Sequence, residues 1–152
     1  MRVLCLSFVI LFALVSGASA DWEYTRWGMT PEQVAAASKG MVKVLPANAR
    51  NTQGLANLQE AAAGTHKDGN LLLDVRFSFN TGTNGLDCVT YALRNAAQNA
   101  LLKDTLTKRY GPPQKQGGIP DIGLEETSWT KADDIDFATV KGRGAVVLHC
   151  RK

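Results

Sequence analysis

The sequence is poor in the features that most directly mark a function. Among 152 residues it has three cysteines and two histidines, and none of them shows the C-x-x-C or H-x-x-x-H spacing of a metal site. No segment approaches the ~20 consecutive apolar residues that a membrane-spanning helix needs. No glycine-rich loop stands between a strand and a helix, as nucleotide phosphates require. The basic residues are scattered rather than gathered in a stripe. These shortages argue against a metal or other cofactor, a membrane anchor and a nucleic-acid partner.

A convergent set of catalytic residues is also missing from the sequence. His149 and Cys150 are neighbours in a predicted strand, where successive side chains point to opposite faces, so the two cannot act together. His66 is then the imidazole left as a partner for Cys150, and it lies in a predicted turn. We therefore expect a non-enzymatic protein. The alternatives are a small envelope hydrolase or redox enzyme that uses the thiol of Cys150 or Cys88, and a small-molecule carrier with an apolar pocket between sheet and helices.

The first 20 residues have the composition of a secretory signal peptide. Arg2 precedes an apolar run from Val3 to Val15, and a tail of small residues follows. We predict cleavage between Ala20 and Asp21. Cys5 lies inside the apolar run instead of following it, so a lipid anchor is not expected. The protein is therefore predicted to be periplasmic or secreted.

Residues 21–152 have the length of a single domain with a modest core. Loss of Arg2 leaves 16 basic residues against 14 acidic ones, a net charge of +2. Two cysteines remain, Cys88 and Cys150, and in an oxidising compartment an isolated pair is typical of a disulfide. Such a bond would stabilise the fold by roughly 4 kcal/mol in the chain-entropy description. Two unpaired, buried thiols are the alternative.

Two helices are predicted from their start and stop signals. The first begins at TPEQ, where Thr30 can cap the helix, a proline suits the first helical position and Gln33 completes a capping box. Gly40 is expected to end it. The second helix runs from a cap at Asn95 to the stop signal GPP at residues 111–113.

Strands are predicted where apolar residues recur at every second position. The segment from Leu71 to Asn80 alternates apolar and polar residues, which indicates a strand with one buried face. Turn signals separate the other predicted strands, which are Leu58–Thr65, Leu86–Leu93, Leu124–Lys131, Ile135–Val140 and Ala145–Arg151. The expected fold is α+β, with two helices packed on one face of an antiparallel sheet of about six strands. In this expected fold, the order of one helix followed by a three-strand meander occurs twice along the chain.

An aromatic cluster, DWEYTRWGMTPEQV, precedes the first helix. If this segment is extended, Trp22, Tyr24 and Arg26 share one side and form a candidate binding surface. Trp27 then lies on the other side, as the core residue beneath the helix. Trp129, in a later strand, is also expected in the core.

Several motifs together resemble a group of small exported bacterial proteins of unknown function. They are WGMTPEQV, the strand-turn-strand VRFSFNTGTNGLDCVTYAL, a helix that closes in KRYGPP, and a later SW before paired strands. More distantly, the helix-and-meander order is similar to the outer-membrane assembly lipoproteins of the SmpA/BamE kind and to the modules of β-lactamase inhibitor proteins. Both act by binding other proteins. The resemblance implies a protein-binding module in a Gram-negative periplasm, with an envelope protein or another macromolecule as its partner. The chain has no lipobox, so a lipid tether is not implied.

Overall fold

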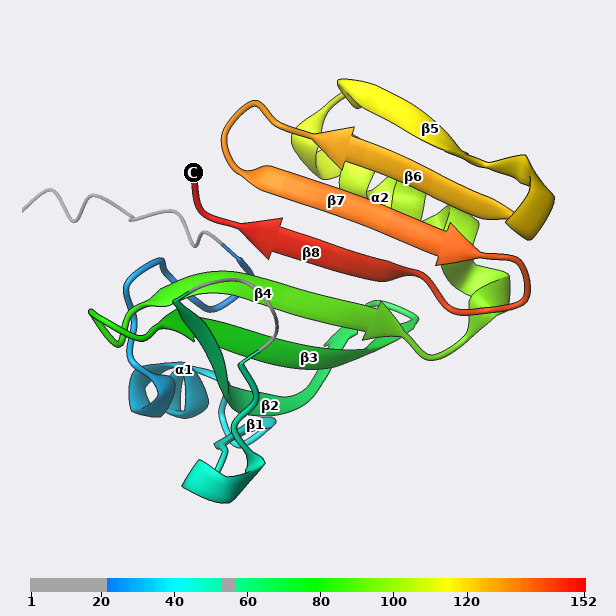
Figure 1. Ribbon diagram of the computed structural model, residues 1–152. Helices are drawn as coiled ribbons and strands as arrows, with labels where there is room; N and C mark the ends of the chain where they lie inside the picture. Colours follow the sequence, from blue (N-terminus) through cyan, green and yellow to red (C-terminus); the bar gives the residue numbers. More distant parts are fainter. Residues whose placement is uncertain (1–21, 53–56) are drawn as a thin grey trace, which may run out of the picture.

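The computed structural model describes residues 22–52 and 57–152, and the predicted signal peptide and its cleavage site at Ala20 and Asp21 lie outside this part of the chain. Strands dominate the described residues. They are β1 (Val42–Val44), β2 (Leu58–Asp68), β3 (Leu71–Asn80), β4 (Leu86–Leu93), β5 (Lys115–Ile119), β6 (Leu124–Trp129), β7 (Asp134–Val140) and β8 (Val146–Cys150). All eight join one antiparallel sheet in the order β1-β2-β3-β4-β8-β7-β6-β5 (Figure 1).

The helices are few and short in comparison. They are α1 (Pro31–Ala37) and α2 (Asn99–Tyr110), with three 3-10 turns, η1 (Ala47–Ala49), η2 (Ala96–Gln98) and η3 (Pro120–Ile122). Each α-helix precedes four strands that run as a meander, and this order occurs twice along the chain. The two meanders meet at their last strands, because β4 pairs with β8. No helix in the described residues is long and apolar enough to cross a membrane.

The expected arrangement of two helices on a sheet of about six strands is wrong. The sheet has two more strands, β1 and β5. β1 has only three residues, too few to show a period of two. β5 has the sequence KQGGI, whose two glycines suggest a loop, yet pairing with β6 along its whole length holds it extended. The first helix is also shorter than expected. It ends at Ala37 and not near Gly40, and the Ser38 hydroxyl then accepts a hydrogen bond from the backbone N–H of Val42 at 2.9 Å.

The start of α1 agrees with the predicted capping box. The backbone N–H of Gln33 donates to the Thr30 hydroxyl at 3.4 Å, and the N–H of Thr30 donates to the Gln33 side-chain oxygen at 2.9 Å. Pro31 occupies the first turn, where a missing N–H leaves no gap in the hydrogen bonding. These contacts set the direction in which the chain leaves the N-terminal segment and enters the helix.

One face of the sheet is covered and carries the hydrophobic core. The alternating residues of β3 that are buried on it are Leu71, Leu73, Val75, Phe77 and Phe79. Trp22 from the N-terminal segment, Val34 from α1, and Leu102 and Leu106 from α2 belong to the same core cluster. Both helices and the N-terminal segment therefore pack against the same face. In Figure 1, α2 lies behind β6, β7 and β8.

The disulfide joins the two halves of the molecule. Cys88 on β4 lies directly opposite Cys150 on β8, with an S–S distance of 2.12 Å and a Cα–Cα distance of 4.1 Å. The predicted pairing of Cys88 with Cys150 is confirmed. Because β4 and β8 are the strands at which the two meanders meet, the bond crosses the centre of the sheet.

Candidate functional site

The face of the sheet opposite the core is uncovered over β4, β8, β7 and β6, and we call this surface the open face. No helix in the described part of the chain lies over it (Figure 1). Its centre is apolar, because Ala92 on β4 pairs with Val146 on β8, and Val146 pairs with Ala138 on β7. Leu148 lies two residues further along β8. Val146 is 44% exposed, so this apolar centre is open to contact.

The charge on the open face is uneven. Its β6–β7 side carries three exposed carboxylates, Asp134, Asp136 and Glu126, and none of them forms an ion pair with another residue that the structure describes. On the β3 side, Asp74 accepts hydrogen bonds from Arg94 at 3.0 and 3.1 Å, and this contact lowers the pKa of the Asp74 carboxyl. The β3 side is therefore close to neutral, whereas the β6–β7 side is acidic.

Val146 and Leu148 were not identified from the sequence as candidate binding residues. The segment from Ala145 to Arg151 was predicted as a strand, but Val146, Val147 and Leu148 are consecutive apolar residues. Such a run has no period of two, so it does not indicate which side chains face the core. The sequence signal for this exposed surface lies on β7, whose alternating acidic side chains mark an exposed face.

The predicted surface of Trp22, Tyr24 and Arg26 does not form a row. The chain makes a tight turn here, in which the backbone N–H and the hydroxyl of Thr25 both donate to the Trp22 carbonyl at 2.8 Å. Glu23, at the turn, has a φ of 49°. The side-to-side alternation of an extended segment is therefore lost.

The turn sends the first tryptophan into the core. Trp22 is only 2% exposed, and its ring centroid lies 5.6 Å from that of Phe77 and 5.6 Å from that of Tyr91. Tyr24 is half-buried and Arg26 is exposed. Of the three predicted residues, Trp22 is thus part of the hydrophobic core and cannot contact a partner.

The other two tryptophans differ in burial. Trp27, expected in the core, is half-buried and packs on its border, with its ring nearly perpendicular to that of His149 at a centroid distance of 5.3 Å. Trp129 is 1% exposed, which confirms its predicted place in the core. Its indole N–H donates to the carbonyl of Gly111 at 2.9 Å, just after the end of α2. This bond fixes the exit of α2 against the sheet.

An ionic cluster ties the N-terminal turn to both halves of the fold. Glu23 lies between His66 on β2, at 3.5 Å, and the guanidinium of Arg109 on α2. Arg109 also reaches Asp68 at 3.4 Å. The contact with His66 and the pairing with Arg109 lower the pKa of the Glu23 carboxyl from 4.5 to about 2, although burial acts in the opposite direction. Burial raises the pKa of the neighbouring Tyr24 to about 12.

The lowered pKa of Glu23 predicts a loss of stability in acid. A carboxylate whose pKa is depressed by folding stabilises the protein above its unfolded pKa, and this contribution is lost as the pH falls from 4.5 toward 2. Glu23→Gln removes the ionisable group. Urea unfolding of both proteins at several pH values should show a gap in unfolding free energy that is full above pH 5 and narrows toward pH 2. A gap that is constant over this range would contradict the assignment.

A buried histidine lies near the end of α2. The Nε2 atom of His149 is 3.0 Å from a carboxylate oxygen of Asp133, and the His149 side chain is fully buried. The ring of Tyr110 packs nearly perpendicular to that of His149 at a centroid distance of 5.7 Å. A substrate cannot contact an imidazole that has no exposed surface, and the neighbouring Cys150 is held in the disulfide. This geometry favours a structural role for His149.

The sequence was compared with protein-family models, with curated proteins and with solved structures, and none of these matches it. Within residues 22–52 and 57–152, no group of three or more His, Cys, Asp or Glu side chains could hold a metal ion. The fold defines a disulfide-linked, antiparallel sheet protein with one covered face and one open face.

Proposed function

We propose that this protein is an exported, non-enzymatic binding module that holds a folded protein of the bacterial envelope on its open face. The observation that carries the proposal is the one-sided cover of the sheet, which leaves the apolar strip Ala92, Val146 and Ala138 uncovered between charged borders, with Val146 exposed and the two alanines half-buried. An apolar centre with a polar rim is the usual composition of a protein–protein interface. The resemblance of the sequence motifs to protein-binding modules supports the same function.

The charges on the open face indicate the chemistry of the partner. Asp134, Asp136 and Glu126 flank the apolar strip on one side, and Lys115 lies at the outer edge of the sheet beyond them. A partner surface that carries lysine or arginine beside an apolar patch would match this arrangement. Complementary charges of this kind mainly accelerate association and select the partner. The proposed partner is therefore a folded protein with a basic, partly apolar surface.

Rigidity makes the open face suitable for binding. Its strands are paired on both sides, and Cys88 and Cys150 cross-link β4 and β8 at the centre. A surface that is already ordered loses little conformational entropy when a partner binds. The disulfide is also compatible with the oxidising periplasmic or extracellular location that the N-terminal sequence predicts.

The proposal predicts that a charge placed in the apolar strip of the open face strongly weakens binding. Val146→Lys puts a cation in the apolar strip, where it meets the proposed basic partner surface, and Ile122→Lys is the matched control, because Ile122 is 59% exposed and lies in η3, outside the strip. With the purified domain as bait in its own envelope fraction at physiological salt, we expect Val146→Lys to reduce partner capture about tenfold or more. Ile122→Lys should capture as the wild type does.

A double variant tests the charge of the partner surface. Asp134→Asn with Asp136→Asn removes two carboxylates of the acidic border, and it should weaken capture and flatten its dependence on salt. The proposal fails if Val146→Lys captures the same protein as strongly as the wild type, or if Ile122→Lys loses capture to the same extent. Equal salt dependence in the wild type and the Asn variant would overturn the basic partner surface.

A further inference from the structure

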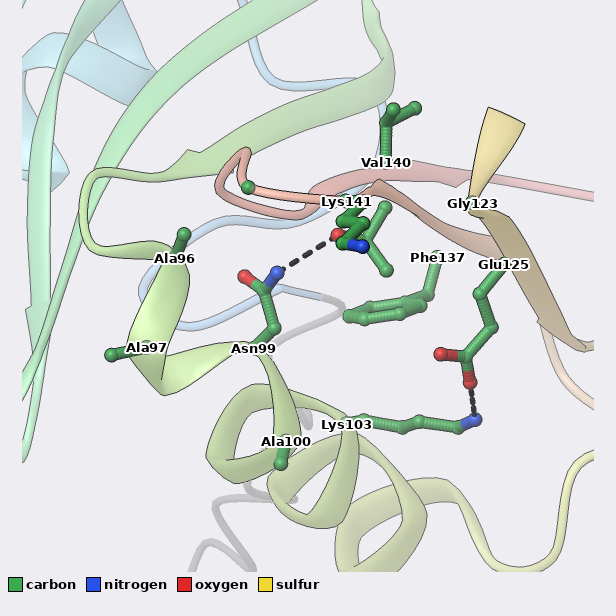
Figure 2. Close-up of a pocket in the computed structure, with 12 residues that line it drawn as sticks. Ala96, Ala97, Asn99, Ala100, Lys103, Gly123, Glu125, Phe137, Val140 and Lys141 are labelled. Carbon is green, nitrogen blue, oxygen red and sulfur yellow. Dashed lines mark hydrogen bonds and ion pairs between the residues drawn. The ribbon is translucent and has the colours of Figure 1, made fainter. Parts of the chain in front are cut away.

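A cavity of about 680 Å³ lies on the covered side of the sheet, away from the open face. It is open to solvent and is bordered by η2 and the first turns of α2 on one side and by β6, β7 and the turn after β7 on the other (Figure 2). Ligand sites in proteins are commonly ~300–1,000 Å³. The size therefore suits a small organic molecule, and the site is independent of the proposed protein-binding surface.

The walls of the cavity are apolar at its base and on its helical side. Phe137, which is 1% exposed, closes the base (Figure 2), and Thr139 follows it on the same face of β7. The methyl groups of Ala96 and Ala100 form the helical wall. These alanines keep the space open, because any larger side chain at their positions would project into it. The body of a ligand here would be apolar.

Asn99 makes the wall rigid. Its side-chain oxygen accepts from the backbone N–H of Ala145 at 2.8 Å, and its amide nitrogen donates to the Thr139 hydroxyl and to the Arg143 carbonyl, both at 2.8 Å. All the hydrogen bonds tie α2 to β7 and to the turn that follows it. The distance between the two walls is thus fixed before a ligand enters.

The charged groups at the cavity are unequal in number. Lys103 on α2 pairs with Glu125 on β6 across the cavity, so these two charges neutralise each other (Figure 2). Lys141 also lines the cavity, and its ammonium group has no hydrogen bond or ion pair with the residues that the structure describes. A second cation is therefore available for an anionic group beside the apolar base.

We propose that this cavity binds a small amphipathic anion, composed of a planar apolar body and one carboxylate or sulfonate. The body would lie against the methyl groups of Ala96 and Ala100 above Phe137, where its burial removes apolar surface from water. The acidic group would pair with Lys141 at the mouth, while the Lys103–Glu125 pair stays intact. This inference does not depend on the function proposed for the open face.

The test uses 8-anilinonaphthalene-1-sulfonate, a planar aromatic sulfonate whose fluorescence rises in an apolar site. The purified protein should bind it saturably, with one molecule per chain. Ala100→Phe fills the cavity and should weaken binding about tenfold or more. Leu101→Phe is the matched control, since Leu101 is 45% exposed on the same helix and does not line the cavity, and it should bind as the wild type does. Circular dichroism checks that each variant is folded.

A variant that removes the charge of Lys141 tests the proposal even if Ala100→Phe does not fold. Lys141→Gln, at an exposed position, should weaken binding of the sulfonate about threefold, as expected for an exposed ion pair. It should leave binding of the uncharged N-phenyl-1-naphthylamine unchanged. Binding of the sulfonate that is unaffected by Lys141→Gln overturns the proposal, as does loss of binding in Val146→Lys, which would place the probe on the open face.

Discussion

Trp22→Ala is expected to lower the free energy of unfolding by about 3–5 kcal/mol, the range for removal of a large aromatic side chain from a core. The Trp22 ring is 2% exposed and lies in ring contact with Phe77, Tyr91 and His66. Truncation to alanine would leave a cavity at the centre of the covered face. Small domains have about 5–15 kcal/mol of stability in total, so this change removes a large share of it.

Urea unfolding followed by far-UV circular dichroism measures this loss. Arg26→Ala is the matched control, because Arg26 belongs to the same segment but is exposed, and its replacement should change stability by about 0.5 kcal/mol or less. Trp22→Phe keeps most of the apolar area and serves as a milder variant if Trp22→Ala does not fold. Equal, small losses in Trp22→Ala and Arg26→Ala would show that Trp22 is not a core residue.

Removal of the disulfide is expected to have an effect of similar size. The bond closes a loop between residues 62 apart in sequence, and in the chain-entropy description this constraint on the unfolded state is worth about 4 kcal/mol. It also joins β4 and β8, the strands at which the two meanders meet. The double variant Cys88→Ala with Cys150→Ala should therefore unfold at a much lower urea concentration than the wild type.

Reduction of the wild-type protein provides the control. A thiol-free phosphine reductant should shift the wild type toward the unfolding midpoint of the double alanine variant, whereas the variant itself should not respond to the reductant. Titration of the unreduced wild-type protein in denaturant should detect no free thiol from Cys88 or Cys150. Two reactive thiols in the purified protein would contradict the disulfide and would return the thiol enzyme to consideration.

Local sequence rules were sufficient where the signal lies within a few consecutive residues. The capping box of Thr30 and Gln33 depends on a spacing of three residues, and the strand from Leu71 to Asn80 depends on strict alternation; both are present in the structure. The pairing of Cys88 with Cys150 could also be predicted, because Cys5 falls within the predicted signal peptide and the two remaining cysteines allow a single intramolecular bond.

The prediction failed where partner strands decide the conformation. The β5 segment, KQGGI, has no local preference for an extended strand, and it becomes one because β6 offers backbone groups along its whole length. The three residues of β1 are likewise extended because β2 lies beside them. For this reason the sheet has eight strands, although alternation alone indicated about six.

The roles of the first two tryptophans show the same limit. An extended segment would have placed Trp22 on the side of a binding surface and Trp27 in the core. The turn closed by Thr25 moves Trp22 into the core instead and leaves Trp27 half-buried at its border. The turn depends on Glu23, whose positive φ is supported by contacts to His66 and Arg109 from distant parts of the chain.

By itself, the sequence determined the capped start of α1, the alternating strand β3 and the cysteine pair, since each of these depends on short spacings or on composition. Only the tertiary structure decided which face of the sheet is covered. Val146 and Val147 are chemically identical neighbours, yet Val147 has no exposed surface and Val146 is 44% exposed. The difference arises because both helices and the N-terminal turn pack on the same side of the sheet. That choice creates the open face on which the proposed function rests.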